Sequence, residues 1–170
     1  MEEPEVWLRG PITAIPPLLQ PVAHAILQSL EDVEKLMNDF PPEKLWEKPS
    51  GVASPGFHLR HLTGVLDRLF TYAREEVLSP EQFEYLRQEG SPGSAPVSDL
   101  LFNFRFQVEK CLLQLKQTDE AKLLKPIGVG RKKLPSNILG LLFHAAEHTQ
   151  RHTGQLLVTA RVLNENRMNL

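Results

Sequence analysis

Apolar residues recur every three or four positions in four stretches of the chain, and each stretch predicts a helix with one buried face. The first runs from Pro17 to Phe40 and stops at the Pro41-Pro42 pair, because proline has no N–H and restricts the residue before it. The second begins at Ser54-Pro55, a capping hydroxyl followed by proline at the first helical position, and continues to about Val77.

The other two helices are predicted from near Ser98 to about Lys116, and from a Ser136-Asn137 cap to about Leu163. Between them, "LLKPIGVGRKKLPSN" has two prolines and two glycines and predicts a loop or a short hairpin. The polar connector Ser79–Pro96 contains "EQFEYLRQ", which fits a short turn of helix. Four helices of about 20 residues, without an alternating strand pattern, predict an all-α four-helix bundle with long connectors.

Two of the predicted inner faces carry histidines. On the second helix, the face predicted to point inward carries His58, His61 or Leu62, Val65, Leu69 and Tyr72. The face predicted to point outward carries Arg60, Asp67, Arg68 and Arg74. The last helix presents Leu141, Ala145, His148, His152, Gln155, Thr159 and Val162. A buried imidazole or carboxamide costs a few kcal/mol unless it is satisfied, so consecutive polar side chains on an inner face point to a common partner. A metal ion is the simplest such partner.

Residues four apart on a helix are separated by about 6 Å along the axis and ~40° around it, so His148 and His152 can direct ring nitrogens at one ion. A third ligand must come from the second helix, where His58 and His61 are the candidates. His61 is flanked by Leu62 and is expected to lie deeper. Three histidines leave a coordination position open, as in catalytic sites. The alternative is a chance pair of histidines that binds no metal.

Other side chains have plainer interpretations. His144 is expected either to contact a ligand from behind or to be a core residue with its hydrogen bonds satisfied. Glu147 is expected to be a solvated carboxylate, and a general base is the alternative. Cys111, the single cysteine, falls in an apolar helical pattern and is expected to be buried, which leaves no thiolate cluster for a metal. Di-iron bundles and zincins need a glutamate at other spacings from histidine, so the spacing here disfavours both kinds of metal site.

Composition narrows the function classes further. The 19 basic and 21 acidic residues form no long basic run, which disfavours a nucleic-acid partner. The N-terminus lacks a signal peptide, and no apolar stretch approaches the ~18–20 residues of a membrane span, so a cytoplasmic protein without membrane contact is expected. At 170 residues, a single domain spanning residues 1–170 is expected.

The segments "FHLRHL" and "LLFHAAEHTQRHTGQL" resemble the DinB/YfiT-like superfamily along essentially the whole chain. The family pattern of a histidine before an apolar residue matches His61-Leu62, and its His-x-x-x-His pair followed by Gly-Gln matches His148, His152 and Gly154-Gln155. Thr153 stands where relatives often carry arginine or another polar residue. The resemblance implies a four-helix bundle of up-down-down-up type with a metal site made by His61, His148 and His152.

The resemblance also implies a metalloenzyme, since characterised relatives are metal-dependent transferases of low-molecular-weight thiols and others are assigned as hydrolases. The expected partners are a small-molecule substrate and such a thiol, with a homodimer as an open alternative. Three imidazoles without a thiolate or an obvious carboxylate suit zinc or nickel better than magnesium or calcium. A non-catalytic bundle, with a structural metal or none, is the competing hypothesis.

Overall fold

The computed structural model of the chain describes residues 3–130 and 132–165. Its helices are α1 (Gln20–Met37), α2 (Pro55–Ala73), α3 (Pro80–Gln88), α4 (Val97–Gln117) and α5 (Ile138–Glu165), and an antiparallel hairpin is formed by β1 (Pro126–Val129) and β2 (Leu134–Asn137). Short 3-10 turns occupy Val6–Leu8, Pro17–Leu19, Pro42–Lys44, Pro49–Gly51 and Glu120–Lys122. No helix among the described residues is both long and apolar enough to span a membrane.

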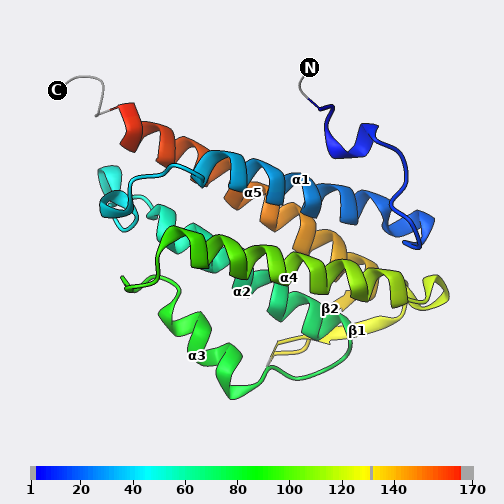
Figure 1. Cartoon of the computed structure of the whole chain (residues 1–170). Coiled ribbons are helices and arrows are strands. Elements are labelled where there is room, and N and C mark those ends of the chain that lie inside the picture. The colour runs from blue at the N-terminus through cyan, green and yellow to red at the C-terminus, as the bar shows by residue number, and fades with distance from the viewer. Residues whose placement is uncertain (1–2, 131, 166–170) are drawn as a thin grey trace.

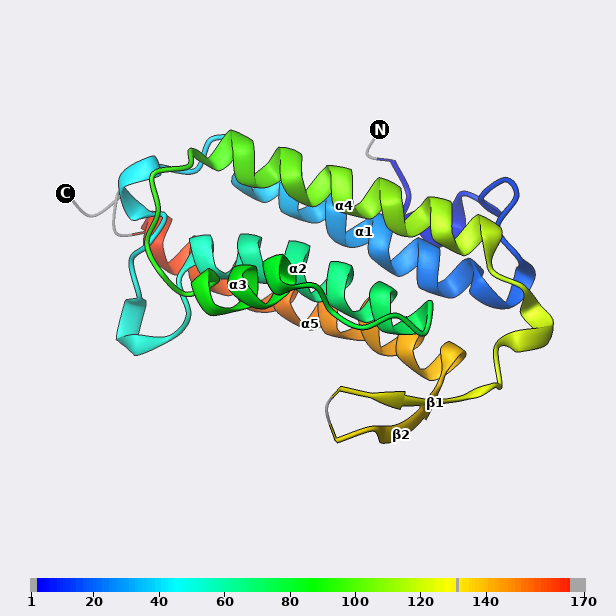
Figure 2. The ribbon, with the colours of Figure 1, turned by 90° about the horizontal axis from the view of Figure 1, so that it is seen from below.

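Four long helices lie side by side, and α3 lies outside them, next to α2 (Figures 1 and 2). Helix α1 packs on α5 and on α4. Helix α4 also packs on α2, and α2 and α5 pack on each other. In both views α1 and α5 run in one direction and α2 and α4 in the other. The chain is therefore mostly helical, as predicted, but it also has the hairpin that the sequence left as an alternative to a loop.

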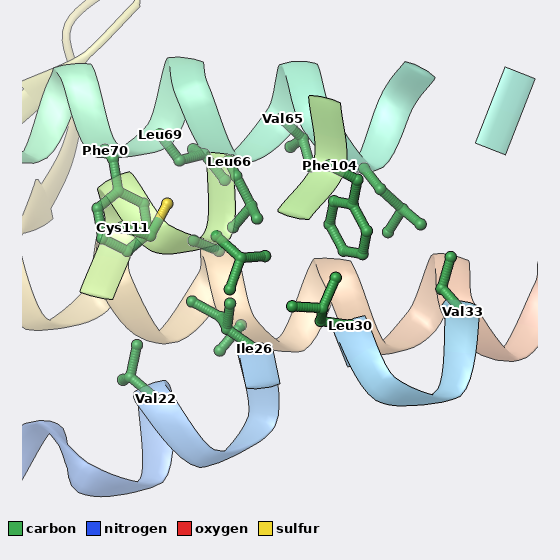
Figure 3. Packing of buried hydrophobic residues seen from close by; sticks show 14 of the residues in the cluster. Val22, Ile26, Leu30, Val33, Val65, Leu66, Leu69, Phe70, Phe104 and Cys111 are labelled. Carbon is green, nitrogen blue, oxygen red and sulfur yellow. The ribbon is translucent and has the colours of Figure 1, made fainter. Parts of the chain in front are cut away.

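Apolar side chains from α1, α2 and α4 meet in the core (Figure 3). Ile26 on α1, Leu66 on α2 and Phe104 on α4 are fully buried. Each large apolar side chain stabilises the fold by roughly 1.5–3 kcal/mol when it is buried, so this cluster contributes much of the free energy that holds the helices together. Cys111 is buried as predicted, and burial raises the pKa of its thiol.

The helix ends follow local chemistry. The Ser54 hydroxyl accepts a hydrogen bond from the Phe57 N–H, and the Asn137 side chain accepts one from the Gly140 N–H at 2.7 Å, so both predicted caps are present. The predicted end of the second helix at Val77 was wrong: α2 ends at Ala73. Glu75 takes a φ of 64°, a left-handed conformation that the α-helix cannot continue through.

The inner face predicted for the last helix was partly wrong. Gln155 and Val162 are exposed, and the buried row of that half of α5 instead contains Thr149, Thr153, Leu156, Thr159, Ala160 and Leu163. The reason is that α5 packs on both α1 and α2, so its buried stripe is centred between two neighbours. His148 and His152 consequently lie at the edge of the buried stripe, where they are partly exposed and face α2.

Candidate metal centre

His61 from α2 meets His148 and His152 from α5. One ring nitrogen of each lies within 4.8 Å of the others, a spacing at which the group could hold a metal ion. Nε2 of His61 is 2.9 Å from Nε2 of His148, and the ring centres of His61 and His152 are 4.3 Å apart. The four-residue spacing places the two α5 histidines on successive turns of one face. The structure thus brings together the three histidines that the sequence singled out.

His58 lies behind this group. The expectation that His61 is the deeper of the two was wrong: His58 is 2% exposed, whereas the side chain of His61 is 15% exposed. The difference arises because His58 faces α5, with Nδ1 3.1 Å from Nδ1 of His152. His61 lies one turn further along α2, where its ring stacks on Phe57 with centres 5.1 Å apart.

A buried carboxylate that the sequence analysis missed holds His61. Glu89, at the end of α3, accepts a hydrogen bond from Nδ1 of His61 at 2.7 Å and one from Nη1 of Arg68 at 2.6 Å. Arg68 was predicted to point outward, but it is 8% exposed and Glu89 is 3% exposed. The error arises because α3 folds back onto α2 and covers a face that would otherwise be solvated. Nothing in the connector's local pattern marks Glu89.

One weak sequence signal for this contact is Gly64 in the middle of α2. A Cβ at this position would lie 2.2 Å from Oε1 of Glu89 and 2.6 Å from Nη1 of Arg68. Glycine in a helix costs about 1 kcal/mol relative to alanine. Its presence here is explained by the close approach of the Glu89 carboxylate to the helix.

The imidazoles of His58, His148 and His152 are expected to be neutral at physiological pH. Burial, reinforced by the neighbouring His61, lowers the pKa of His58 and of His148 to about 4 and that of His152 to about 3. A metal ligand must be neutral, so the environment favours ligation over protonation.

Donor chemistry also fits a cation. Because Glu89 accepts the Nδ1 proton of His61, Nε2 of that ring carries a lone pair, and it faces Nε2 of His148. A carboxylate behind a ligating histidine is the usual way in which proteins orient such a ring. His148 Nδ1 is buried and finds no partner among the described residues. Three nitrogen donors, one of them fixed by a carboxylate, fit a divalent transition metal.

Two neighbouring polar side chains of α5, His144 and Glu147, lie at its surface. His144 was expected to support the ligands or to be a core residue; its side chain is half exposed, with Nδ1 3.5 Å from the Glu147 carboxylate, so the core assignment was wrong. Arg151 lowers the pKa of Glu147, which agrees with the expected solvated carboxylate. The Thr153 hydroxyl donates to the Thr149 carbonyl inside the bundle, at 3.0 Å.

A hollow of about 550 Å³ adjoins the histidines, and we call it the His58 hollow. It is lined by Val52, Ala53, His58, Arg151, Gly154, Gln155, Val158 and Thr159. A larger hollow of about 640 Å³, bounded in part by Phe83 and Ile127, includes none of the histidines. The connectors Ser79–Pro96 and Asp119–Pro135 both contribute residues to that larger hollow and none to the His58 hollow. The His58 hollow is thus bordered by a histidine whose Nδ1 lies 3.1 Å from Nδ1 of His152.

Comparison with known proteins finds a matching family model and a structure of similar fold. The family model of the DinB superfamily matches residues 25–156, a range that includes His58, His61, His148 and His152. No curated protein matches the chain. A crystal structure described as a conserved protein from Enterococcus faecalis is similar, with 15% identity, a TM-score of 0.66 and coverage of 84% of this chain and 95% of that chain. At this identity the structural likeness concerns the fold alone.

Proposed function

The chain belongs to the DinB superfamily, and we propose that it is a metal-dependent enzyme that transfers a low-molecular-weight thiol to a small electrophile. The observation that carries the proposal is the convergence of His61, His148 and His152. The buried Glu89–Arg68 pair behind His61 supports it, because removing two charges from water is costly and this pair orients a candidate ligand.

Zinc or nickel is the proposed ion, held by His61, His148 and His152, with a coordination position left for the thiol. When bound, such a cation lowers the pKa of a coordinated thiol or water, so that a nucleophile is available at neutral pH. The transferred thiol must come from outside the protein. Cys111 is fully buried and its pKa is raised, so the protein's own thiol is neither accessible nor ionised.

The chain's own residues would orient the reactants. Glu89 fixes the tautomer of His61 and Arg68 fixes Glu89, so the ring is held before a reactant arrives. Most of the surface that lines the His58 hollow is apolar, and Val52, Ala53 and Val158 contribute to it, which favours a small organic electrophile over a highly charged one.

The test begins with elemental analysis of the purified protein and of His152→Ala, with His24→Ala as a matched control on α1. We expect zinc or nickel near one equivalent in the wild type and in the control, and none in His152→Ala. Loaded protein is then assayed with cysteine and glutathione against 1-chloro-2,4-dinitrobenzene and related electrophiles. Metal-dependent thioether formation supports the proposal. Hydrolysis without thiol consumption would replace it with a hydrolase, and absence of metal would refute it.

A further inference from the structure

His58 has two different environments on its two sides. Its Nδ1 lies 3.1 Å from Nδ1 of His152, inside the bundle. The same ring forms part of the wall of the His58 hollow. His58 is therefore the side chain through which the hollow and the candidate metal centre are connected.

The proton positions on this pair follow from elementary imidazole chemistry. A neutral imidazole has one N–H and one lone pair. His152 directs Nδ1 at His58, which leaves its Nε2 for an ion; a cation bound at Nε2 would place the proton of His152 on Nδ1. That proton is donated to the lone pair on Nδ1 of His58. The proton of His58 must then be on Nε2, so the nitrogen that remains for the hollow is a hydrogen-bond donor.

The other polar side chains that line the hollow can all donate a hydrogen bond, although Gln155 and Thr159 can accept one as well. Among the described residues no carboxylate lines the hollow, and Arg151 adds a cationic donor held by Glu147. Val52, Ala53 and Val158 supply apolar surface. A ligand that fits this combination accepts hydrogen bonds at one end and is apolar at the other.

We propose that His58 binds the substrate, donating its Nε2–H to a carbonyl or carboxylate oxygen of a short apolar molecule, while its Nδ1 fixes the tautomer of His152. This inference rests on the proposed function, because it assigns the substrate class of the same site. It treats His58 as a substrate-binding and positioning residue, and it needs no change of protonation state.

Two substitutions separate the two roles. The amide of asparagine can occupy the place of Nδ1 of histidine, and the longer glutamine can occupy the place of Nε2. In zinc-loaded protein, His58→Asn should keep the zinc affinity within about threefold and weaken acceptor binding about tenfold. His58→Gln should weaken zinc binding on the order of 10–100-fold, as the loss of a group behind a ligand does, and keep acceptor binding. His24→Asn and His24→Gln are matched controls.

The probes are hexanoate, hexanamide and hexylamine, which share one chain length and differ in the head group. Binding of each probe is followed by the NMR methyl signals of Val52 and Val158 and by calorimetry. Long-range ¹H–¹⁵N NMR spectra report the tautomers of His58 and His152. We expect hexanoate and hexanamide to shift the methyl signals and hexylamine not to, with the His58 proton on Nε2.

Several results would overturn the inference. These are preferential binding of hexylamine, a His58 proton on Nδ1 in the zinc-loaded protein, or equal effects of the asparagine and glutamine substitutions on zinc and on the probes. If both variants fail to fold, the wild-type tautomer and the probe preference still decide. Failure of the wild type to bind zinc contradicts the proposed function; zinc binding together with any of these results contradicts this inference alone.

Discussion

Replacing Glu89 tests whether the buried carboxylate positions the candidate metal centre. Its two oxygens accept hydrogen bonds from His61 and Arg68 at 2.7 and 2.6 Å, and its side chain is only 3% exposed. Glu89→Gln keeps the shape and one acceptor oxygen but removes the charge. Glu89→Ala removes both contacts and leaves the buried guanidinium of Arg68 without its partner.

The expected magnitudes differ between the two variants. Loss of a group that orients a ligating histidine typically weakens metal binding 10–100-fold, so Glu89→Gln should raise the zinc dissociation constant by about that factor. Breaking a buried ion pair by removing one partner costs about 3–5 kcal/mol. At this chain length 1 kcal/mol corresponds to roughly 2–4 °C, so Glu89→Ala should lower the Tm of the metal-free protein by on the order of 10 °C.

Competition titration with a chromophoric chelator gives the zinc affinity, and calorimetry gives the Tm. The matched control is Glu84→Gln on the same helix, where the carboxylate is half exposed and pairs with Arg87 at the surface. That variant should change stability by no more than about 0.5 kcal/mol and leave the zinc affinity unaltered. A Glu89→Gln protein with wild-type zinc affinity would refute the positioning role.

Four further predictions address the ligands, the pH dependence of zinc occupancy, the pH dependence of stability and the contact at Gly64. His152→Ala should abolish zinc binding yet keep a helical circular dichroism spectrum, because the apolar core holds the fold; unfolding at room temperature would make the metal structural. Since burial lowers the pKa of His152 to about 3, zinc occupancy should persist at pH 6 and collapse nearer pH 4, and loss already at pH 6.5 would contradict this. Because burial holds the pKa of His58 at about 4 against 6.5 in the unfolded chain, the unfolded state binds the extra proton between these values. His58 alone should therefore cost the metal-free protein up to about 3 kcal/mol of unfolding free energy as the pH falls across that window, and the lowered pKa values of His148 and His152 add to this loss. The fall in the urea midpoint should be smaller in His58→Asn than in the wild type, and an equal fall would contradict this. Gly64→Ala should destabilise by about 1–3 kcal/mol, since its Cβ would lie 2.2 Å from Glu89, whereas Gly154→Ala meets nothing within 4 Å and should stabilise by up to about 1 kcal/mol; equal urea midpoints for the two would contradict this.

Much of the fold could be predicted from local pattern. The apolar periodicity places the four long helices, and the caps at Ser54 and Asn137 are where the residue types indicated. Burial of Cys111 and the pairing of His148 with His152 are also local properties, because both follow from spacing on a single helix. Local pattern works here because helix periodicity and capping depend on residues within about four positions of each other.

The remainder was decided by contacts between distant segments. That His58 is deeper than His61, that Arg68 is buried and that Glu89 supports His61 all depend on how α3 and α5 cover α2. The shift of the buried stripe on α5 has the same origin, since two neighbouring helices share that face. A helical period determines which residues share a face, but the free energy of burying that face is set by what packs against it. Only the tertiary structure brings the Glu89 carboxylate, 28 positions along the chain, to the ring of His61.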